Sequence, residues 1–211
     1  MQTSELKRLA QGAEAASRRA ASALAGSAAD RGLLDVAYGF ADSPFGRLLV
    51  ATTRHGLVTL AYPNEDVDRT LEYLAGAISP RVLESQAATD PVRRELDEYF
   101  EGRRHEFSTA VDMRLTHGFF RKVLLQTARI PYGSVSTYRD VATRAGSPRA
   151  MRAAGNALAS NPIPIVVPCH RVIQTGGGLG GYTSGLDKKI ALLQLEGALL
   201  YSRAPVRVPR R

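Results

Sequence analysis

The sequence predicts an α+β protein with a small N-terminal domain, built on a three-stranded antiparallel sheet with helices, and a mostly helical C-terminal domain. Two observations support this prediction. Short β-type runs stand at hairpin spacing between residues 34 and 62. The second half of the chain instead consists of helical patterns separated by Gly and Pro. A chain of 211 residues, 44% of them hydrophobic, is long enough to bury the core of one or two domains.

Three strands are expected first. The runs Leu34–Phe40, Arg47–Thr52 and Leu57–Tyr62 are separated by the turn signals Asp42-Ser43-Pro44 and His55-Gly56. Turns this short join neighbouring antiparallel strands, so we expect a small sheet.

Two helices are expected after the strands, over Asp66–Ala75 and Pro91–Phe100. Pro91 suits the first position of its helix, where the missing N–H costs no hydrogen bond. The charge-rich stretch Gly102–Met113 is then expected to connect the two domains.

The second half begins with a helix that must end before Pro131, because proline cannot continue it. One face of this helix carries Phe120, Val123, Leu124 and Thr127. A short helix over about Thr137–Ala145 follows, and Gly146 ends it. We expect Ser147 to cap the next helix and Pro148 to take its first position.

A helix, a short turn with Gly and a second helix form the pattern of a helix-turn-helix, so a winged-helix-like domain is expected. Met151, Ala154 and Leu158 are predicted to point inward on the second helix. Its outer face carries Arg149, Arg152, Gly155, Asn156 and Ala159. Small residues there let a helix approach a nucleic-acid groove closely, although a two-helix corner packed in a core is the alternative.

Charge is distributed unevenly along the chain. Residues 1–120 carry 14 Lys and Arg against 17 Asp and Glu, whereas residues 121–211 carry 14 against 3. The basic second half therefore favours contact with polyanions, unless the charge merely keeps the protein in solution. No apolar run approaches the roughly 18 to 20 residues that span a bilayer, so no membrane partner is expected.

We expect four segments: an Ala- and Arg-rich flexible arm (1–30), an N-terminal α/β domain (31–111), a C-terminal domain (112–200) and a basic tail (201–211). The arm lacks the apolar stretch of a secretory signal, and an organellar transit peptide is a weaker alternative. The lone Cys169 excludes internal disulfides and multi-cysteine zinc sites and fits a reducing compartment. We therefore expect a cytoplasmic protein with no metal and no cofactor.

The densest chemical signal surrounds Cys169. The run Ile165-Val166-Val167 predicts a buried strand, and the prolines around it stiffen the backbone that enters Cys169. His170 and Arg171 can help to lower the pKa of the thiol from about 8.5, unless Cys169 is an inert buried residue. Adjacent side chains point in different directions, so proton transfer to His170 needs an unusual bend or a bridging water; we favour the water.

The histidine needs a carboxylate to orient it, and Glu196 is a candidate because it shares one helix side with Lys189 and Leu193. A solvated Glu196 at the helix end is the alternative. The glycines at 176, 178 and 181 satisfy G-x-G-x-x-G, but no βαβ unit surrounds them. We interpret them as a loop that approaches a ligand closely, without a nucleotide cofactor.

The motif Pro168-Cys169-His170-Arg171-Val172, with Asn161-Pro162 before it and Gly181-Tyr182 and Lys189…Glu196-Gly197 after it, resembles the O6-alkylguanine-DNA alkyltransferase family. The resemblance is specific from about residue 119 to 197 and looser before. It implies stoichiometric, irreversible DNA repair: an alkyl group, such as methyl, moves from O6 of guanine or O4 of thymine in double-stranded DNA to Cys169 after base flipping. It also implies a monomer that contacts the minor groove with weak sequence preference; cooperative binding along DNA is left open.

The resemblance also implies catalytic roles. Cys169 is the nucleophile and alkyl acceptor, His170 its base through a water, and Glu196 the carboxylate that orients His170. Asn161 braces the turn beside the site.

The remaining implied roles concern the nucleotide. Tyr138 helps to rotate it and donates a proton or hydrogen bond to the departing guanine, with Lys189 in support, while Arg152 fills the space of the flipped base. The base pocket is implied to be lined by Tyr182, Thr183, the backbone of Val172 and, on the alkyl side, Pro164. Further DNA contacts are expected from Ser147, Arg149, Ala153, Gly155 and Asn156.

Two other functions stay open. The stretches 115–120 and 183–185 depart from the family's usual pattern, so a protein that binds alkylated DNA with little or no transfer is the main alternative. A Cys/His hydrolase is the second, although an oxyanion hole and a non-adjacent histidine are not evident.

Overall fold

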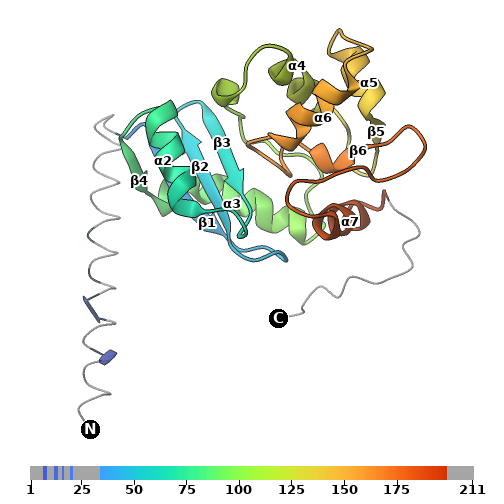
Figure 1. The fold of residues 1–211 in the computed structure, drawn as a ribbon. Coiled ribbons are helices and arrows are strands. Elements are labelled where there is room, and N and C mark those ends of the chain that lie inside the picture. The colour runs from blue at the N-terminus through green and yellow to red at the C-terminus, as the bar shows by residue number, and fades with distance from the viewer. Residues whose placement is uncertain (1–6, 9–11, 14–15, 17–19, 21–33, 199–211) are drawn as a thin grey trace.

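The computed structural model describes residues 7–8, 12–13, 16, 20 and 34–198. Most of the predicted arm over 1–30 and the whole tail over 201–211 lie outside the described residues. The predicted α+β class is confirmed: a sheet with helices forms the first half, and packed helices form the second (Figure 1). No helix in the described part of the chain is long and apolar enough to cross a membrane.

The N-terminal sheet differs from the prediction, because the described residues form four strands in a mixed sheet rather than three antiparallel ones. β1 (Val36–Ala41), β2 (Leu48–Thr53) and β3 (Gly56–Ala61) form the expected antiparallel meander. β4 (Val82–Glu84) pairs with β1 in parallel, giving the order β3-β2-β1-β4. A run of three residues is too short to show alternation, and only the crossover through α2 (Val67–Ala77) makes the parallel pairing possible.

The second N-terminal helix, α3 (Gln86–Phe100), starts earlier than predicted, so Pro91 lies inside it and not at its first position. The start is set by Ser85, whose hydroxyl accepts a hydrogen bond from the N–H of Ala88. This helix packs on β1 and β2. Gly39 allows the close approach, because a Cβ there would lie 2.5 Å from the hydroxyl oxygen of Thr89.

The second half contains short helices and one small sheet. Its elements are η1 (Met113–Leu115), α4 (Gly118–Thr127), β5 (Ser136–Thr137), α5 (Tyr138–Arg144), α6 (Met151–Ala159), η2 (Cys169–Arg171), β6 (Val172–Ile173) and α7 (Leu186–Leu195). α5 matches the predicted short helix, with Thr137 as its cap. β5 and β6 pair in parallel and place α5 beside the end of η2.

The start of α6 was predicted three residues too early. Ala150 is its N-cap, and the N–H of Ala150 donates to the Ser147 carbonyl in a turn, so Ser147 does not cap the helix and Pro148 precedes it. Met151 consequently lies in the first turn and is 39% exposed instead of inward, while Ala154 and Leu158 are buried as expected.

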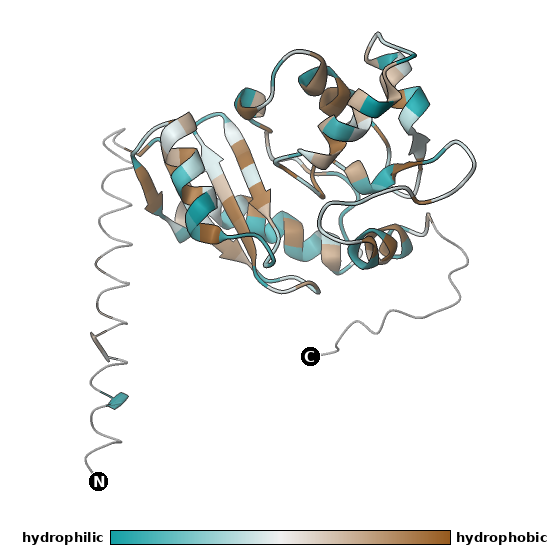
Figure 2. Ribbon diagram, viewed as in Figure 1, coloured by the Kyte–Doolittle hydropathy of each residue, from teal (hydrophilic) through white to brown (hydrophobic). Residues whose placement is uncertain are grey.

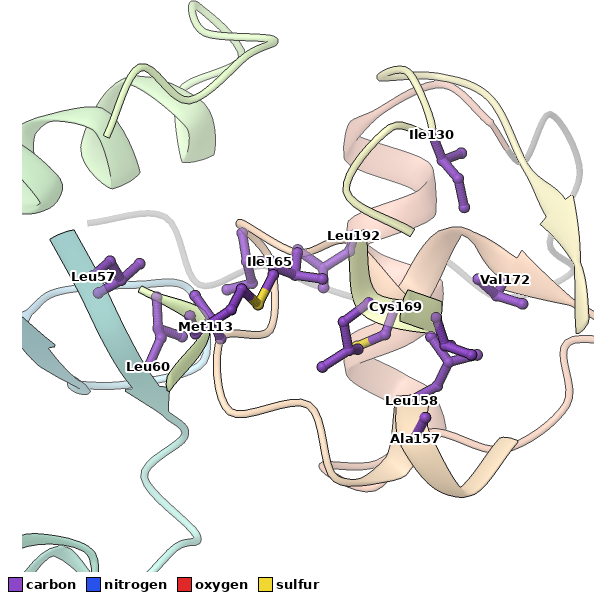
Figure 3. Close-up of a cluster of buried hydrophobic side chains, with 14 of the residues drawn as sticks. Leu57, Leu60, Met113, Ile130, Ala157, Leu158, Ile165, Cys169, Val172 and Leu192 are labelled. Carbon is purple, nitrogen blue, oxygen red and sulfur yellow. The ribbon is translucent and has the colours of Figure 1, made fainter. Parts of the chain in front are cut away.

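One hydrophobic core joins the two halves. Leu57 and Leu60 of β3 and Met113 belong to the same buried cluster as Ile165 and Leu192 (Figure 3). Hydrophobic residues run along β2 and β3 and occur again in α4 and α7 (Figure 2). The N–H of Leu60 also donates to the carbonyl of Pro162 at 2.8 Å, so β3 holds the segment that leads to Cys169.

Candidate active site

The segment that leads to Cys169 is a tight turn rather than the predicted strand. Ile165 has φ +73°, the one positive φ of a non-glycine residue in the described chain, and this conformation costs about 1–3 kcal/mol. A hydrogen bond from the N–H of Val167 to the carbonyl of Ile163 (2.9 Å) closes the turn. The reason lies in the prolines, which lack the N–H groups that a strand ladder needs. They stand at positions 162, 164 and 168.

Cys169 opens the 3₁₀ turn η2 and is 7% exposed. Its Sγ accepts a hydrogen bond from Nδ2 of Asn161 at 3.2 Å. The same Nδ2 donates to the carbonyl of Val167 (2.8 Å), and Oδ1 of Asn161 accepts from the N–H of Ile163 (3.1 Å). Asn161 therefore holds both the strained turn and the sulfur.

The sulfur lies in the wall of a cavity of about 330 Å³. That volume is near the lower end of ligand pockets, about 300–1,000 Å³, and suits one base-sized ring system. The cavity is lined by Glu65, Tyr138, Gly155, Leu158, Ala159, Asn161, Pro164, Cys169, Gly181, Tyr182, Thr183 and Ser184. Seven of the residues expected to act in catalysis, base binding or DNA contact thus meet at one place, although they come from four separate parts of the second half.

His170 points away from this cavity into a buried charge cluster. Its Nε2 lies 2.8 Å from Oε1 of Glu196, and both side chains are buried. Arg171 donates to both carboxylate oxygens, from Nε to Oε2 and from Nη2 to Oε1, each at 2.8 Å. The hydroxyl of Tyr99 donates to Oε1 at 2.6 Å. Glu196 is therefore fully paired and not solvated.

These contacts set the charge of each member. Burial alone would raise the pKa of Glu196, but the hydrogen bonds from His170, Arg171 and Tyr99 outweigh it and lower the pKa to about 2. Burial lowers the pKa of His170, opposed by Glu196. A neutral His170 that donates from Nε2 to a carboxylate keeps a free lone pair on Nδ1, and Nδ1 has no hydrogen-bond partner.

The thiol itself is not activated by its neighbours in the chain, contrary to the prediction from sequence. Burial raises the pKa of Cys169, and the groups that oppose this are Asn161, Lys189 and Tyr182. The guanidinium of Arg171 is engaged with Glu196 and with the carbonyl of Ile130. We therefore expect a neutral thiol in the free protein, which must lose its proton in the reaction.

Lys189 and Val172 stand behind the cavity instead of lining it. Nζ of Lys189 donates to the carbonyls of Val172 (2.6 Å), Leu179 and Gly181 (3.4 Å), and burial lowers its pKa to about 8. The lysine therefore ties the glycine-rich loop to β6 and so fixes the cavity wall.

Comparisons with known proteins decide the family. The model of the 6-O-methylguanine DNA methyltransferase ribonuclease-like domain matches residues 36–113, and that of the DNA-binding domain matches residues 118–198. The chain belongs to the 6-O-methylguanine DNA methyltransferase family. As a member of this family it is a DNA repair methyltransferase.

Similar proteins align with this chain over most of their own length. The methylated-DNA–protein-cysteine methyltransferase of Mycobacterium leprae is 41% identical over 155 residues, 74% of this chain and 88% of that protein. The Methanosarcina barkeri protein of the same name is 38% identical over 159 residues, 75% of this chain and 96% of its own. The crystal structure of Mycobacterium tuberculosis O6-methylguanine methyltransferase superimposes with a TM-score of 0.67 at 34% identity, covering 82% of this chain and 96% of that one. A structure of the Mycobacterium tuberculosis protein in complex with DNA gives 0.66 at 34% identity, covering 81% and 96%.

The residues expected to contact DNA lie on and before α6. Arg149, Arg152 and Asn156 are exposed, and Ser147 and Ala153 are half-buried. Gly155 lies on the same helix in the cavity wall, where a Cβ would be 3.9 Å from the Tyr138 ring. One helix of this family member therefore has an exposed basic side and an edge on the cavity.

Sequence reasoning missed two tyrosines that the N-terminal half contributes. Tyr99 reaches Glu196, and the hydroxyl of Tyr62 lies 3.0 Å from that of Tyr182 in the cavity wall. Tyr99 lies in the predicted helix over Pro91–Phe100, in the first half, where the looser resemblance to the family was the available signal. Nothing in the sequence marks Tyr62, because its contact depends on how the two halves pack.

Proposed function

We propose that this protein repairs DNA by moving a methyl or larger alkyl group from O6 of guanine, or O4 of thymine, to Sγ of Cys169, once per molecule. One observation carries the proposal: the sole cysteine lies in the wall of a base-sized cavity, next to a buried histidine with one free ring nitrogen. A metal or cofactor has no part in this displacement.

The chemistry follows from the charges of the site. The thiol proton of Cys169 passes through one water to Nδ1 of His170, and Glu196 stabilises the imidazolium that forms. Sγ then bonds to the alkyl carbon, and the C–O6 bond breaks with its electron pair left on the guanine. The guanine takes up a proton from the Tyr138 hydroxyl in the cavity wall, and Tyr138 regains one from solvent while His170 releases the thiol proton to solvent. A thioether is stable, so the cysteine is not regenerated.

DNA is the partner, and its lesion must leave the stack before Cys169 can reach it, because the sulfur is buried. We assign Arg152 to the space that the flipped base vacates and the small outer residues of α6 to the minor groove. Phosphate contacts then dominate affinity, so sequence preference is weak and binding falls with salt. We propose a monomer, with cooperative binding along DNA as the alternative.

The domain division that we propose, 31–111 and 112–200, is supported by the two matched ranges. The first part carries the sheet. The second carries the cysteine, the DNA-facing helix and the cavity lining except for Glu65.

The test is the intact mass of the protein before and after incubation with a duplex that contains one O6-methylguanine. We expect a gain of about 14 Da at Cys169, saturating at one per chain, and no gain for Cys169→Ser. Lesion-selective binding with no gain in mass would instead support the lesion-binding protein and would overturn the transfer reaction.

A further inference from the structure

The carboxylate behind His170 is held from both halves of the molecule. Tyr99 lies in α3, within the range matched by the ribonuclease-like domain, whereas Glu196 follows α7 in the DNA-binding domain. Their contact, 2.6 Å between the Tyr99 hydroxyl and Oε1 of Glu196, is buried. The N-terminal half thus touches the group that orients the histidine, 97 residues away in the chain.

We propose that Tyr99 is a positioning residue for alkyl transfer: its hydroxyl fixes the Glu196 carboxylate and moderates the pull of that carboxylate on His170. The inference rests on the proposed function, in which His170 accepts the thiol proton. Oε1 accepts hydrogen bonds from Tyr99, His170 and Arg171, while Oε2 accepts from Arg171. Each donor draws charge from Oε1, so the carboxylate stabilises the imidazolium less than a bare one would.

The surroundings make Tyr99 a fixed donor. Its ring packs edge to face on Phe100 and Tyr132 and against Phe107, with centroids 5.4 to 6.1 Å apart. Burial raises the pKa of the Tyr99 hydroxyl well above its usual value, so it stays protonated over the whole range in which His170 titrates. The hydroxyl therefore acts as a constant neutral donor, not as a second acid.

The other charged and titratable groups that act on this pair come from the second half. Arg171 from η2 and Lys189 from α7 act on His170, Tyr182 interacts with Tyr99, and Tyr132 from the loop after α4 packs on the Tyr99 ring. Tyr132 donates to the carbonyl of Leu195 at 2.9 Å and not to the carboxylate of Glu196. It thus provides a matched control: a tyrosine hydroxyl lost next to the cluster, without a change at Glu196.

The experiment compares the full-length wild type, Tyr99→Phe and Tyr132→Phe. The single-turnover rate of methyl transfer from an O6-methylguanine duplex is measured against pH, together with the ring ¹⁵N shifts of His170. Without the Tyr99 hydroxyl the carboxylate holds the imidazolium more tightly, so the acid limb of the rate profile and the His170 titration both move to higher pH. We expect a shift of about half to one unit, which lowers the rate on that limb about three- to tenfold. Tyr132→Phe leaves both positions unchanged.

Equal rate losses at every pH in both variants, or unchanged His170 shifts in Tyr99→Phe, would overturn the proposal and leave Tyr99 a packing residue. If Tyr99→Phe does not fold, a monofluorotyrosine at position 99 keeps the ring and makes the hydroxyl a stronger donor. It must then move both readouts to lower pH, and failure to do so overturns the proposal. A wild type that transfers no alkyl group would contradict the proposed function, whereas the His170 shifts would still test Tyr99.

Discussion

The two ring nitrogens of His170 have different surroundings: Nε2 lies beside a carboxylate whose two oxygens both accept hydrogen bonds, whereas Nδ1 has no hydrogen-bond partner. On the Nε2 side, Glu196 accepts four hydrogen bonds: one from Tyr99, one from His170 and two from Nε and Nη2 of Arg171. On the other side, Nδ1 has no partner and Sγ of Cys169 accepts one hydrogen bond, from Asn161. Hydrogen bonds keep the charge constant on the Glu196 side of His170. The thiol proton and the sulfur of Cys169 react on the other side.

The largest effect is expected when the buried carboxylate of Glu196 is removed. Glu196→Gln leaves Arg171 buried without a counterion and removes the group that stabilises a protonated His170. We expect a loss of about 3–5 kcal/mol in the free energy of unfolding, a fall in Tm of roughly 10 °C and alkyl transfer reduced at least about 100-fold. Thermal unfolding and single-turnover rates measure both. Glu84→Gln, on the short edge strand β4, is the control; equal behaviour of the two variants would contradict the account.

Acid should also destabilise the protein through Glu196. The pKa of this residue gives the direction of the effect. Its pKa in the folded state, about 2, lies below that of an unfolded glutamate, so its contribution to stability is complete above about pH 4.5. The contribution is lost as pH falls from there towards 2, and amounts to about 3 kcal/mol. Urea unfolding between pH 2 and 6 should therefore show a steeper fall for the wild type than for Glu196→Gln. Parallel curves would place the acid sensitivity elsewhere.

Substitutions on the Cys169 side of His170 should change stability and alkyl transfer less. Asn161→Ala removes three hydrogen bonds and loosens the turn at Ile165, so we expect a loss of about 1–3 kcal/mol. Alkyl transfer should slow by about tenfold, since the sulfur loses its donor. The exposed Asn64→Ala serves as control. If transfer were unaffected while stability fell, Asn161 would brace the turn without acting on the sulfur.

The smallest effect is expected at buried Tyr62, whose hydroxyl contacts Tyr182 of the cavity wall. Tyr62→Phe removes one hydroxyl of the pair with Tyr182, so stability should fall by about 1 kcal/mol or less and transfer should change less than about threefold. Urea titration beside Tyr73→Phe, on the exposed side of α2, measures the difference. A larger loss of transfer would mean that Tyr62 holds Tyr182 in the position that the reaction needs.

Local sequence patterns predicted much of the fold. They failed where the structure depends on contacts between residues far apart in the chain. Alternation placed β1 to β3 within one or two residues, but β4 has no pattern of its own and exists because β1 offers an edge. The apolar run Ile165–Val167 has the composition of a strand, yet flanking prolines and the contact of Leu60 with Pro162 fold it into a turn.

The site divides in the same way. The motif around Cys169 led to Asn161, His170 and Glu196, because the family resemblance carries their spacing. The position of Arg171 across the carboxylate and the burial that raises the pKa of the thiol depend on tertiary packing, and the contact of Tyr99 depends on packing between the two halves. None of these three features can be predicted from residues adjacent in the sequence.

The most direct test of the comparison is the ionisation of Cys169 in the free protein. Because the chain has a single cysteine, ¹³Cβ labelling of cysteine gives one NMR signal that reports its titration without ambiguity. We predict a thiol at neutral pH, with a pKa raised above the ordinary value of about 8.5, since burial disfavours the thiolate. A thiolate already present at neutral pH would contradict it, because the sulfur side would then carry a fixed charge before any substrate binds.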